Sequence, residues 1–140
     1  MNIEKYKEYS PVVLRISLSL VFLWFGLSQI FNPDMFLGYL PDWAVDYAGM
    51  MHMRFAIIPD STYFLLFLNG TMETALGTFL LLGVFTRLSS LFLGVHLFFI
   101  MLSLGYNDVA VRDFGLALAT FSIFLHGADK WCLDKKIKNK

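Results

Sequence analysis

Several features that mark common classes of protein are scarce or absent in this sequence of 140 residues. It contains one cysteine, Cys132, so no disulfide can form within the chain and no CxxC motif exists for thiol exchange or zinc binding. Its 11 Lys and Arg balance its 11 Asp and Glu, which leaves no general attraction to nucleic acid. It carries no flavin, haem or iron–sulfur motif, so we expect no intrinsic cofactor.

Apolar residues, in contrast, are abundant. They make up 57% of the chain, against 16% for charged residues. A soluble domain of this length cannot hide so much apolar surface, because its polar shell is thick relative to its core. The composition therefore indicates a protein of the lipid bilayer.

Four apolar stretches are long enough to cross a bilayer, whose core of ~30 Å needs about 20 helical residues. We predict spans at about residues 11–31, 62–84, 88–104 and 111–125. The short connections between the last three spans force antiparallel neighbours. The fold class predicted is an all-α membrane protein, a four-transmembrane antiparallel helix bundle that forms a single domain over residues 1–140.

The first stretch and the segment after it contain specific boundary signals. Asn32-Pro33-Asp34 ends the first span. Lys5 and Lys7 precede this span as they would precede a secretory signal, but its length, the intervening Arg15 and the lack of a small-x-small cleavage site favour a membrane span. In the outer segment 32–61, Asp42 can cap a short helix that we expect to lie on the membrane surface, with an apolar side formed by Trp43, Tyr47, Met50 and Met51.

The distribution of basic residues predicts the orientation. With the N-terminus inside, nine of the 11 basic residues fall on or near the cytoplasmic side: Lys5, Lys7, Arg15, Arg87, Lys130, Lys135, Lys136, Lys138 and Lys140. Only Arg54 and Arg112 remain outside. We therefore expect a multi-pass protein of the cell membrane with both termini in the cytoplasm.

Four ionisable residues in or at the ends of the spans form a candidate buried polar pocket: Arg15, Glu73, His96 and Asp113. Such residues usually face the bundle interior and have partners. Glu73 and His96 lie near the centres of adjacent spans, at similar depth. Arg15 lies about six residues, or ~9 Å, from the midplane, and its long side chain can extend most of that distance toward Glu73. Asp113 lies near the outer end of the fourth span.

Two interpretations of this pocket stay open. Arg15 and Glu73 can form a structural ion pair that fixes the register of two helices. Alternatively, the pocket holds a quinone head group or a proton, because a carboxylate and an imidazole at one depth can carry a proton during quinol oxidation. The sequence assigns no catalytic residue.

Metal binding has one weak candidate. Met50, Met51, His52 and Met53 offer thioether and imidazole ligands that suit Cu(I). An interfacial apolar face with one polar residue explains them better, since methionine also serves as adaptable packing. His96 and His126 lie at different depths and are not placed to clamp one haem iron. We expect no metal site.

Several short motifs follow one another in a defined order along the chain. The first span has Leu14-Arg15 and then Phe25-Gly26-Leu27-Ser28, with Gln29 next; the second has Met72-Glu73, Gly77 and Thr86-Arg87-Leu88; the fourth begins with Arg112-Asp113-Phe114; and the chain closes with Leu133-Asp134. Over nearly the whole chain, this order resembles the DoxX family of small four-span membrane proteins. One departure is Gln29, which occupies the position of a lysine in the family pattern.

The resemblance implies a function as well as a fold. The family is named for subunits linked to a quinol oxidase, and its relatives include the membrane subunit of a thiosulfate:quinone oxidoreductase. Our first hypothesis is therefore a membrane subunit of a quinone-linked oxidoreductase complex, inactive alone, with quinone as its ligand and a redox partner subunit that supplies electrons. Fold resemblance is an analogy for function, so whether the chain belongs to an enzyme stays open.

The second hypothesis is a non-catalytic membrane scaffold that recruits partner proteins and whose polar interior serves packing alone. A small-solute transporter is a third, weaker alternative, because four spans leave little room for a pathway without oligomerisation. The expected surroundings are the lipid bilayer and a partner subunit, a homo-oligomer is compatible with the sequence, and no nucleic acid is expected.

Overall fold

The computed structural model describes residues 3–54 and 61–138, with side chains for residues 6–50 and 62–135. Within these ranges the chain is helical and contains no strand. The elements in order are η1 (Ile3–Tyr9), α1 (Ser10–Phe31), η2 (Pro33–Tyr39), α2 (Asp42–Arg54), α3 (Ser61–Leu82), α4 (Thr86–Leu104), α5 (Asp108–His126) and α6 (Leu133–Lys138). The prefix η denotes a 3-10 helix.

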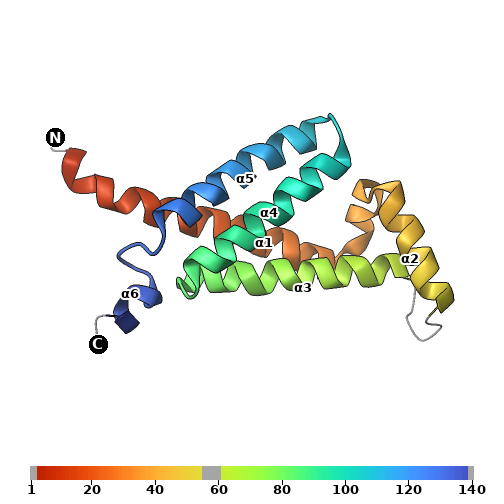
Figure 1. The fold of residues 1–140 in the computed structure, drawn as a ribbon, viewed down its shortest axis with the longest axis horizontal. Coiled ribbons are helices and arrows are strands. Elements are labelled where there is room, and N and C mark those ends of the chain that lie inside the picture. The colour runs from red at the N-terminus through yellow and green to blue at the C-terminus, as the bar shows by residue number, and fades with distance from the viewer. Residues whose placement is uncertain (1–2, 55–60, 139–140) are drawn as a thin grey trace.

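Four of these helices, α1, α3, α4 and α5, are long and apolar enough to cross a membrane. They run alternately up and down, and the described ends of the chain lie at one end of the bundle (Figure 1), called here the terminal end. The opposite end carries η2 and α2 and is called the α2 end. The predicted all-α, four-span antiparallel bundle is confirmed.

The long helices are arranged as two antiparallel pairs, α1 with α3 and α4 with α5. The pairs lie close together toward the terminal end and diverge toward the α2 end (Figure 1). Small residues bring α1 and α3 together, since a Cβ added at Gly70 would lie 2.6 Å from the carbonyl oxygen of Gly26. This divergence leaves space between the pairs at the α2 end.

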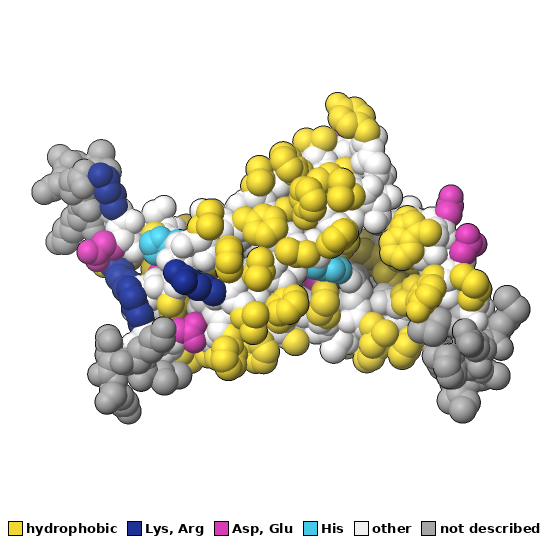
Figure 2. Space-filling model, viewed as in Figure 1, with side chains coloured by type: hydrophobic (Ala, Val, Ile, Leu, Met, Phe, Trp, Pro, Cys, Tyr) yellow, Lys and Arg dark blue, Asp and Glu magenta, His cyan; other side chains and the backbone are white. Residues whose placement is uncertain are grey.

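An apolar core fills the region where all four long helices meet. Its buried members are Leu18, Phe22, Leu80, Leu93, Leu97, Ala117 and Ile123. Large hydrophobic side chains also cover the outside of the molecule (Figure 2), as Trp24, Phe31 and Leu125 show with exposed fractions of 71%, 75% and 75%. A surface of this kind is stable in lipid rather than in water, so the chain is a multi-pass membrane protein.

Two connections differ from the sequence prediction in position. The turn between α3 and α4 covers residues 83–85, so Thr86 already belongs to α4 instead of preceding the predicted start at residue 88. The helix starts early because the Asp134 carboxylate accepts hydrogen bonds from its first amide groups. α5 begins at Asp108, three residues before the predicted start, because the Asn107 side chain caps it by accepting from the Ala110 N–H.

The outer segment contains the expected short helix, α2, and also η2, which the sequence did not predict. α2 packs through small side chains, Ala44 and Ala48, which are 6% and 1% exposed. Trp43 and Tyr47 are 62% and 50% exposed. Buried alanines next to exposed aromatic rings fit a helix lying at the membrane boundary.

Candidate functional site

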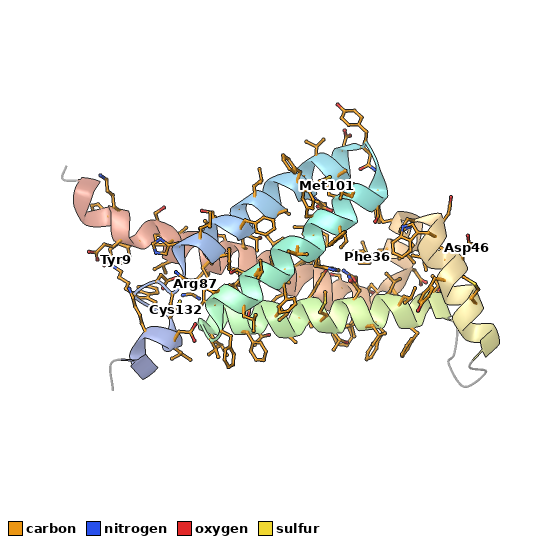
Figure 3. All side chains as sticks on the ribbon, viewed as in Figure 1. Tyr9, Phe36, Asp46, Arg87, Met101 and Cys132 are labelled. Atoms are coloured by element: carbon orange, nitrogen blue, oxygen red, sulfur yellow. The ribbon has the colours of Figure 1, made fainter. Side chains whose placement is uncertain are left out.

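A cleft of about 790 Å³ lies between the two helix pairs at the α2 end. α1, α3, α4 and α5 form its floor and sides, and η2 and α2 cover it. Figure 2 shows this part of the surface hollowed between hydrophobic side chains, and Figure 3 shows Phe36, one of the lining residues, on the η2–α2 side. Its size falls within the range of small-molecule sites, roughly 300–1,000 Å³.

A buried carboxylate, Glu73, lies at the floor of the cleft and is 3% exposed. Gln29 of α1 donates an amide N–H to Glu73 Oε2 at 3.1 Å, and Asn69 of α3 donates to Glu73 Oε1 at 3.1 Å. Asn69 also donates to Gln29 Oε1 at 2.6 Å. Since amide groups of this kind can only donate to a carboxylate, both oxygens of Glu73 act as acceptors.

His96 of α4 completes this cluster. Its Nε2 lies 3.2 Å from Glu73 Oε1, which confirms the prediction that the two residues share one depth. The imidazole is partly exposed and lines the cleft. Its other ring nitrogen has no hydrogen-bond partner among the described residues. In the cluster of Gln29, Asn69, Glu73 and His96, called here the floor cluster, one ring nitrogen of the cleft-lining His96 therefore has no partner among the described residues.

A second pair of charges lines the cleft nearer the α2 end. Asp113 is 4% exposed and accepts from Arg112 Nε and Nη2, each at 2.8 Å. The guanidinium of Arg112 also lies over the Phe25 ring, 5.0 Å from its centroid. Along the helix axis, His96 lies eight residues before the end of α4 and Arg112 four residues after the start of α5, so Arg112 is about 6 Å closer to this end.

Aromatic side chains supply much of the remaining lining: Phe22, Trp24, Phe25, Phe36, Tyr39, Trp43, Tyr47 and Phe99. Trp24 and Phe99 are 71% and 62% exposed on the outer surface, so the cleft borders the lipid-facing side of the bundle. A ligand in it can hold a polar group at the floor cluster and extend an apolar part toward lipid.

Arg15 does not belong to this site, and the predicted approach of Arg15 to Glu73 is wrong. Its Nε donates to Asp129 Oδ2 at 2.6 Å, and its Nη1 donates to the carbonyl oxygens of Leu80 and Leu81 at 2.8 and 2.6 Å. Asp129 and the carbonyl groups at the end of α3 lie at the depth of Arg15, so the side chain need not extend toward the midplane. Glu73 instead interacts with the other members of the floor cluster, Gln29, Asn69 and His96.

The segment after α5 folds back over the terminal end and holds these contacts. Burial by itself raises the pKa of Asp129, but the hydrogen bond and charge of Arg15 and the N–H of Trp131 outweigh it and hold the pKa below its usual value of 3.8. The Cys132 thiol is fully buried, and burial raises its pKa. A buried thiol of this kind is a packing residue and not a reactive one.

No group of three His, Cys, Asp or Glu side chains that could hold a metal ion occurs in the part of the chain that the structure describes. The side chains of Met51, His52 and Met53 lie outside the described residues, so the copper candidate is not placed. Met50 is exposed on α2.

Of the four predicted pocket residues, the structure brings Glu73, His96 and Asp113 to one cleft and places Arg15 elsewhere. Sequence reasoning did not join Gln29 and Asn69 to Glu73, although Asn69 precedes Glu73 by one helical turn and Gln29 lies on the interior face of the first span. It also missed Asp129 as the partner of Arg15. The nearest signal was the Gly127 turn, which returns the chain to the bundle end.

Residues 10–105, more than half of the chain, match the family model of DoxX. The chain belongs to the DoxX family. The resemblance seen in the sequence is thereby confirmed, and so is membership of a family of membrane proteins. The match covers α1 to α4 and hence the floor cluster of this DoxX protein, while Asp113 and Asp129 follow its end.

Comparison with curated proteins found no significant match, and comparison with solved structures found none either. The functional argument for this DoxX protein therefore depends on the geometry of its cleft.

Proposed function

We propose that this DoxX protein is the membrane subunit of a quinone-linked oxidoreductase complex and that the cleft binds the quinone. The observation that carries the proposal is the floor cluster, in which a buried carboxylate and an imidazole 3.2 Å apart close an aromatic cleft that borders lipid. A quinone has the matching chemistry, because its ring carries carbonyl oxygens and its long tail is apolar. The aromatic walls provide stacking surfaces for the ring.

In this proposal the floor cluster handles protons. Reduction of a quinone to a quinol consumes two electrons and two protons. The ring nitrogen of His96 that faces away from Glu73 would hydrogen-bond one quinone oxygen and supply one proton, while Glu73 would stabilise the positive charge on the imidazole before transfer; the second proton would come from water to the other quinone oxygen. Gln29 and Asn69 hold the carboxylate in place through the contacts described above.

The electrons come from a partner subunit, since the sequence has no flavin, haem or iron–sulfur motif.

We further propose that the terminal end faces the cytoplasm. Its described basic residues include Arg87, Lys130 and Lys135, whereas the α2 end carries the acidic residues Asp34, Asp42, Asp46 and Asp108. Reporter fusions at the C-terminus test this orientation, and activity of a periplasm-dependent reporter there would contradict it.

The second candidate function is a membrane scaffold with a structural polar core. One observation favours it: each Glu73 oxygen already has a protein partner, so the floor cluster is complete without a ligand. A cluster of this kind would fix the packing of α1, α3 and α4, and the protein would then act by contacts with other proteins alone.

Quinone binding separates the two functions. The purified protein is reconstituted in lipid nanodiscs, and saturable binding of a quinone is compared among the wild type, Glu73→Gln and His96→Gln. We expect saturable binding by the wild type. In either variant the affinity for the quinone should fall by about tenfold or more, which corresponds to the loss of one hydrogen bond to a charged group. Both changes keep similar side-chain volume, so thermal unfolding in the same nanodiscs reports whether each variant is folded.

Glu8→Gln is the matched control, because it removes a carboxylate that is largely exposed at the terminal end. It should bind quinone like the wild type. Absence of saturable binding by the folded wild type would refute the quinone proposal and favour the scaffold.

A further inference from the structure

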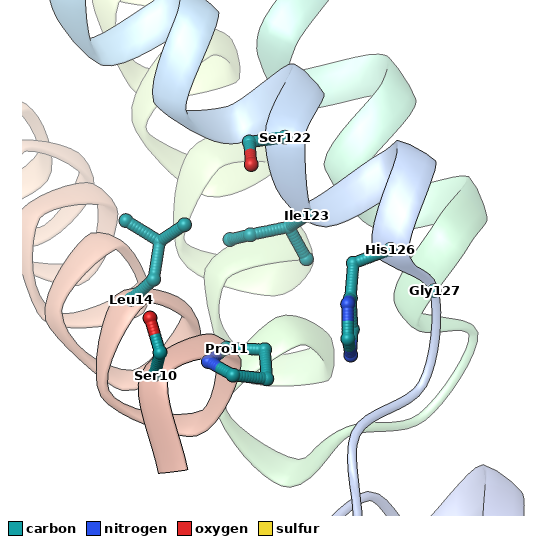
Figure 4. A pocket seen from close by; sticks show the side chains of 7 residues that line it. All are labelled: Ser10, Pro11, Leu14, Ser122, Ile123, His126 and Gly127. Carbon is teal, nitrogen blue, oxygen red and sulfur yellow. The ribbon is translucent and has the colours of Figure 1, made fainter. Parts of the chain in front are cut away.

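A second, smaller pocket lies at the terminal end, in the groove between the start of α1 and the end of α5 (Figure 4). Its volume is about 140 Å³. Three of its lining residues, Ser10, Ser122 and His126, carry polar side chains, and Figure 4 shows them around one space with Leu14 and Ile123 between them. The pocket is separate from the cleft and shares no lining residue with it.

The polar side chains of this pocket are exposed and have no partner among the residues that the structure describes. Ser10, Ser122 and His126 make no side-chain hydrogen bond or ion pair with any residue that the structure describes. By contrast, Ser19, Thr78, Ser90 and Thr120 each donate a hydroxyl hydrogen bond to the carbonyl one turn earlier. Three unpaired polar groups from two helices therefore converge on one pocket.

A cation, Arg87, lies beside one of the residues that line the pocket, although it does not line the pocket itself. A Cβ added at Gly127, which lines the pocket, would lie 2.6 Å from Arg87 Nε and 3.1 Å from Arg87 Nη2. The glycine thus allows the guanidinium to approach the pocket wall. Arg87 is exposed and forms no hydrogen bond or ion pair with a described residue, unlike the buried Arg15. Its five N–H donors are available to an anion.

We propose that this pocket and Arg87 bind the phosphate group of an anionic phospholipid. Hydroxyl, imidazole and guanidinium groups all donate hydrogen bonds to phosphate oxygens. Their place also favours a lipid over a free ion. Ser10 and His126 are the first residue of α1 and the last of α5, so the pocket lies at the ends of two spans, where phospholipid head groups lie.

Apolar side chains lie in the pocket and elsewhere on the outside of α5, and can contact acyl chains. Leu14 and Ile123 form the pocket floor on the span side, and Leu118 and Leu125 of α5 are 53% and 75% exposed. A phosphate bound at the pocket would place its acyl chains along this surface. Basic residues at the end of a span are attracted to anionic lipid head groups.

Native mass spectrometry of the full chain in neutral detergent tests the proposal. Phosphatidylglycerol and phosphatidylcholine with identical acyl chains are titrated onto the wild type, Arg87→Gln, His126→Leu and Lys135→Gln. Lys135→Gln is the matched control, since it removes an exposed cation of the same end outside the pocket. Inorganic phosphate in excess forms a further arm, which separates a free ion from a lipid head group.

We expect the wild type to bind phosphatidylglycerol about tenfold or more tightly than phosphatidylcholine. Arg87→Gln should lose about tenfold in affinity for phosphatidylglycerol, as for one charge-assisted hydrogen bond, and Lys135→Gln less than about twofold. Arg87 is exposed and unpaired, so its variant should unfold at the wild-type temperature.

Equal affinity for the two lipids would overturn the proposal. So would equal losses in Arg87→Gln and Lys135→Gln, because they would indicate general charge attraction alone. Displacement of phosphatidylglycerol by inorganic phosphate would also overturn it and indicate an anion site instead of a lipid site.

Discussion

The Arg15 guanidinium is bound to the Asp129 carboxylate with a distance of 2.6 Å between Nε and Oδ2, and both side chains are almost fully buried. The same guanidinium caps the end of α3 through the carbonyl oxygens of Leu80 and Leu81. Arg15 therefore joins three parts of the chain that are distant in sequence: α1, the end of α3 and the segment after α5.

Removal of one partner of the Arg15–Asp129 pair should strongly destabilise the protein. We expect Asp129→Asn or Arg15→Gln to lower the free energy of unfolding by ~3–5 kcal/mol, because the remaining partner becomes a buried, unpaired charge. Unfolding in mixed micelles with increasing denaturing detergent measures this loss. Glu8→Gln breaks the exposed pair of Glu8 with Lys130 and should leave stability unchanged. Equal stability of Asp129→Asn and the wild type would contradict the prediction.

The contribution of Asp129 should disappear in acid. Its folded pKa lies below the usual value of 3.8, so the unfolded chain binds the proton more readily than the folded chain does. The stabilisation is therefore complete above the unfolded pKa and is lost as pH falls through the folded pKa. The difference in unfolding temperature between the wild type and Asp129→Asn should be constant from about pH 5 to 8 and should narrow below about pH 4. A difference that grows as the pH falls would mean that the folded pKa of Asp129 lies above its unfolded pKa, and would contradict the prediction.

The Asp134 carboxylate should stabilise the start of α4. It accepts hydrogen bonds from the N–H groups of Phe85 and Thr86 and from the Thr86 hydroxyl, at 2.9, 2.8 and 2.9 Å. We expect Asp134→Ala to cost about 1–2 kcal/mol and to speed amide hydrogen exchange at Phe85 and Thr86. Asp46→Ala, on the exposed side of α2, is the control and should change neither quantity. Unchanged exchange at Phe85 and Thr86 in Asp134→Ala would exclude the capping role.

The close contact of α1 and α3 should not tolerate a methyl group. A Cβ at Gly26 would lie 2.5 Å from Thr74 Oγ1 and 2.8 Å from the Gly70 carbonyl oxygen, so the helices would have to move apart. We expect Gly26→Ala to destabilise the protein by about 1–3 kcal/mol. Gly115→Ala is matched to it, because Gly115 is also helical but has no atom within 4 Å of an added Cβ. Gly115→Ala should be neutral or slightly stabilising, and equal losses in the two variants would refute the packing argument.

The spans and their antiparallel order were predictable because they depend on local properties. Bilayer thickness sets the length of each apolar run, and short connections set the direction of the next helix. The short helix beginning at Asp42 was predictable for the same reason, since its start signal and its apolar positions are neighbours in sequence, although no hydrogen bond from a backbone N–H to the Asp42 side chain is seen among the described residues. Its packing was not, because Ala44 and Ala48 are buried only once α3 is beside them.

The polar contacts were predictable only where depth alone decides them. Glu73 and His96 lie at mid-span on adjacent helices, and they meet. Arg15 has a long side chain with several donors, and depth left its partner undetermined. Its true partner lies in an irregular segment after Gly127, whose φ of +78° turns the chain back to the bundle. The path of such a segment depends on tertiary contacts and not on hydropathy or spacing.

The Arg15–Asp129 contact also has a consequence for the order of events during synthesis. The acceptors of the Arg15 side chain lie 65, 66 and 114 positions later in the chain. A guanidinium without partners is costly in hydrocarbon, so we expect Arg15 to stay near the aqueous boundary until these acceptors have been synthesised. The two helix pairs can form earlier, because the charged acceptor of this arginine, Asp129, follows the last of the four long helices. A chain that ends before Asp129 would leave Arg15 without its charged partner, with only the carbonyl oxygens of Leu80 and Leu81 as acceptors.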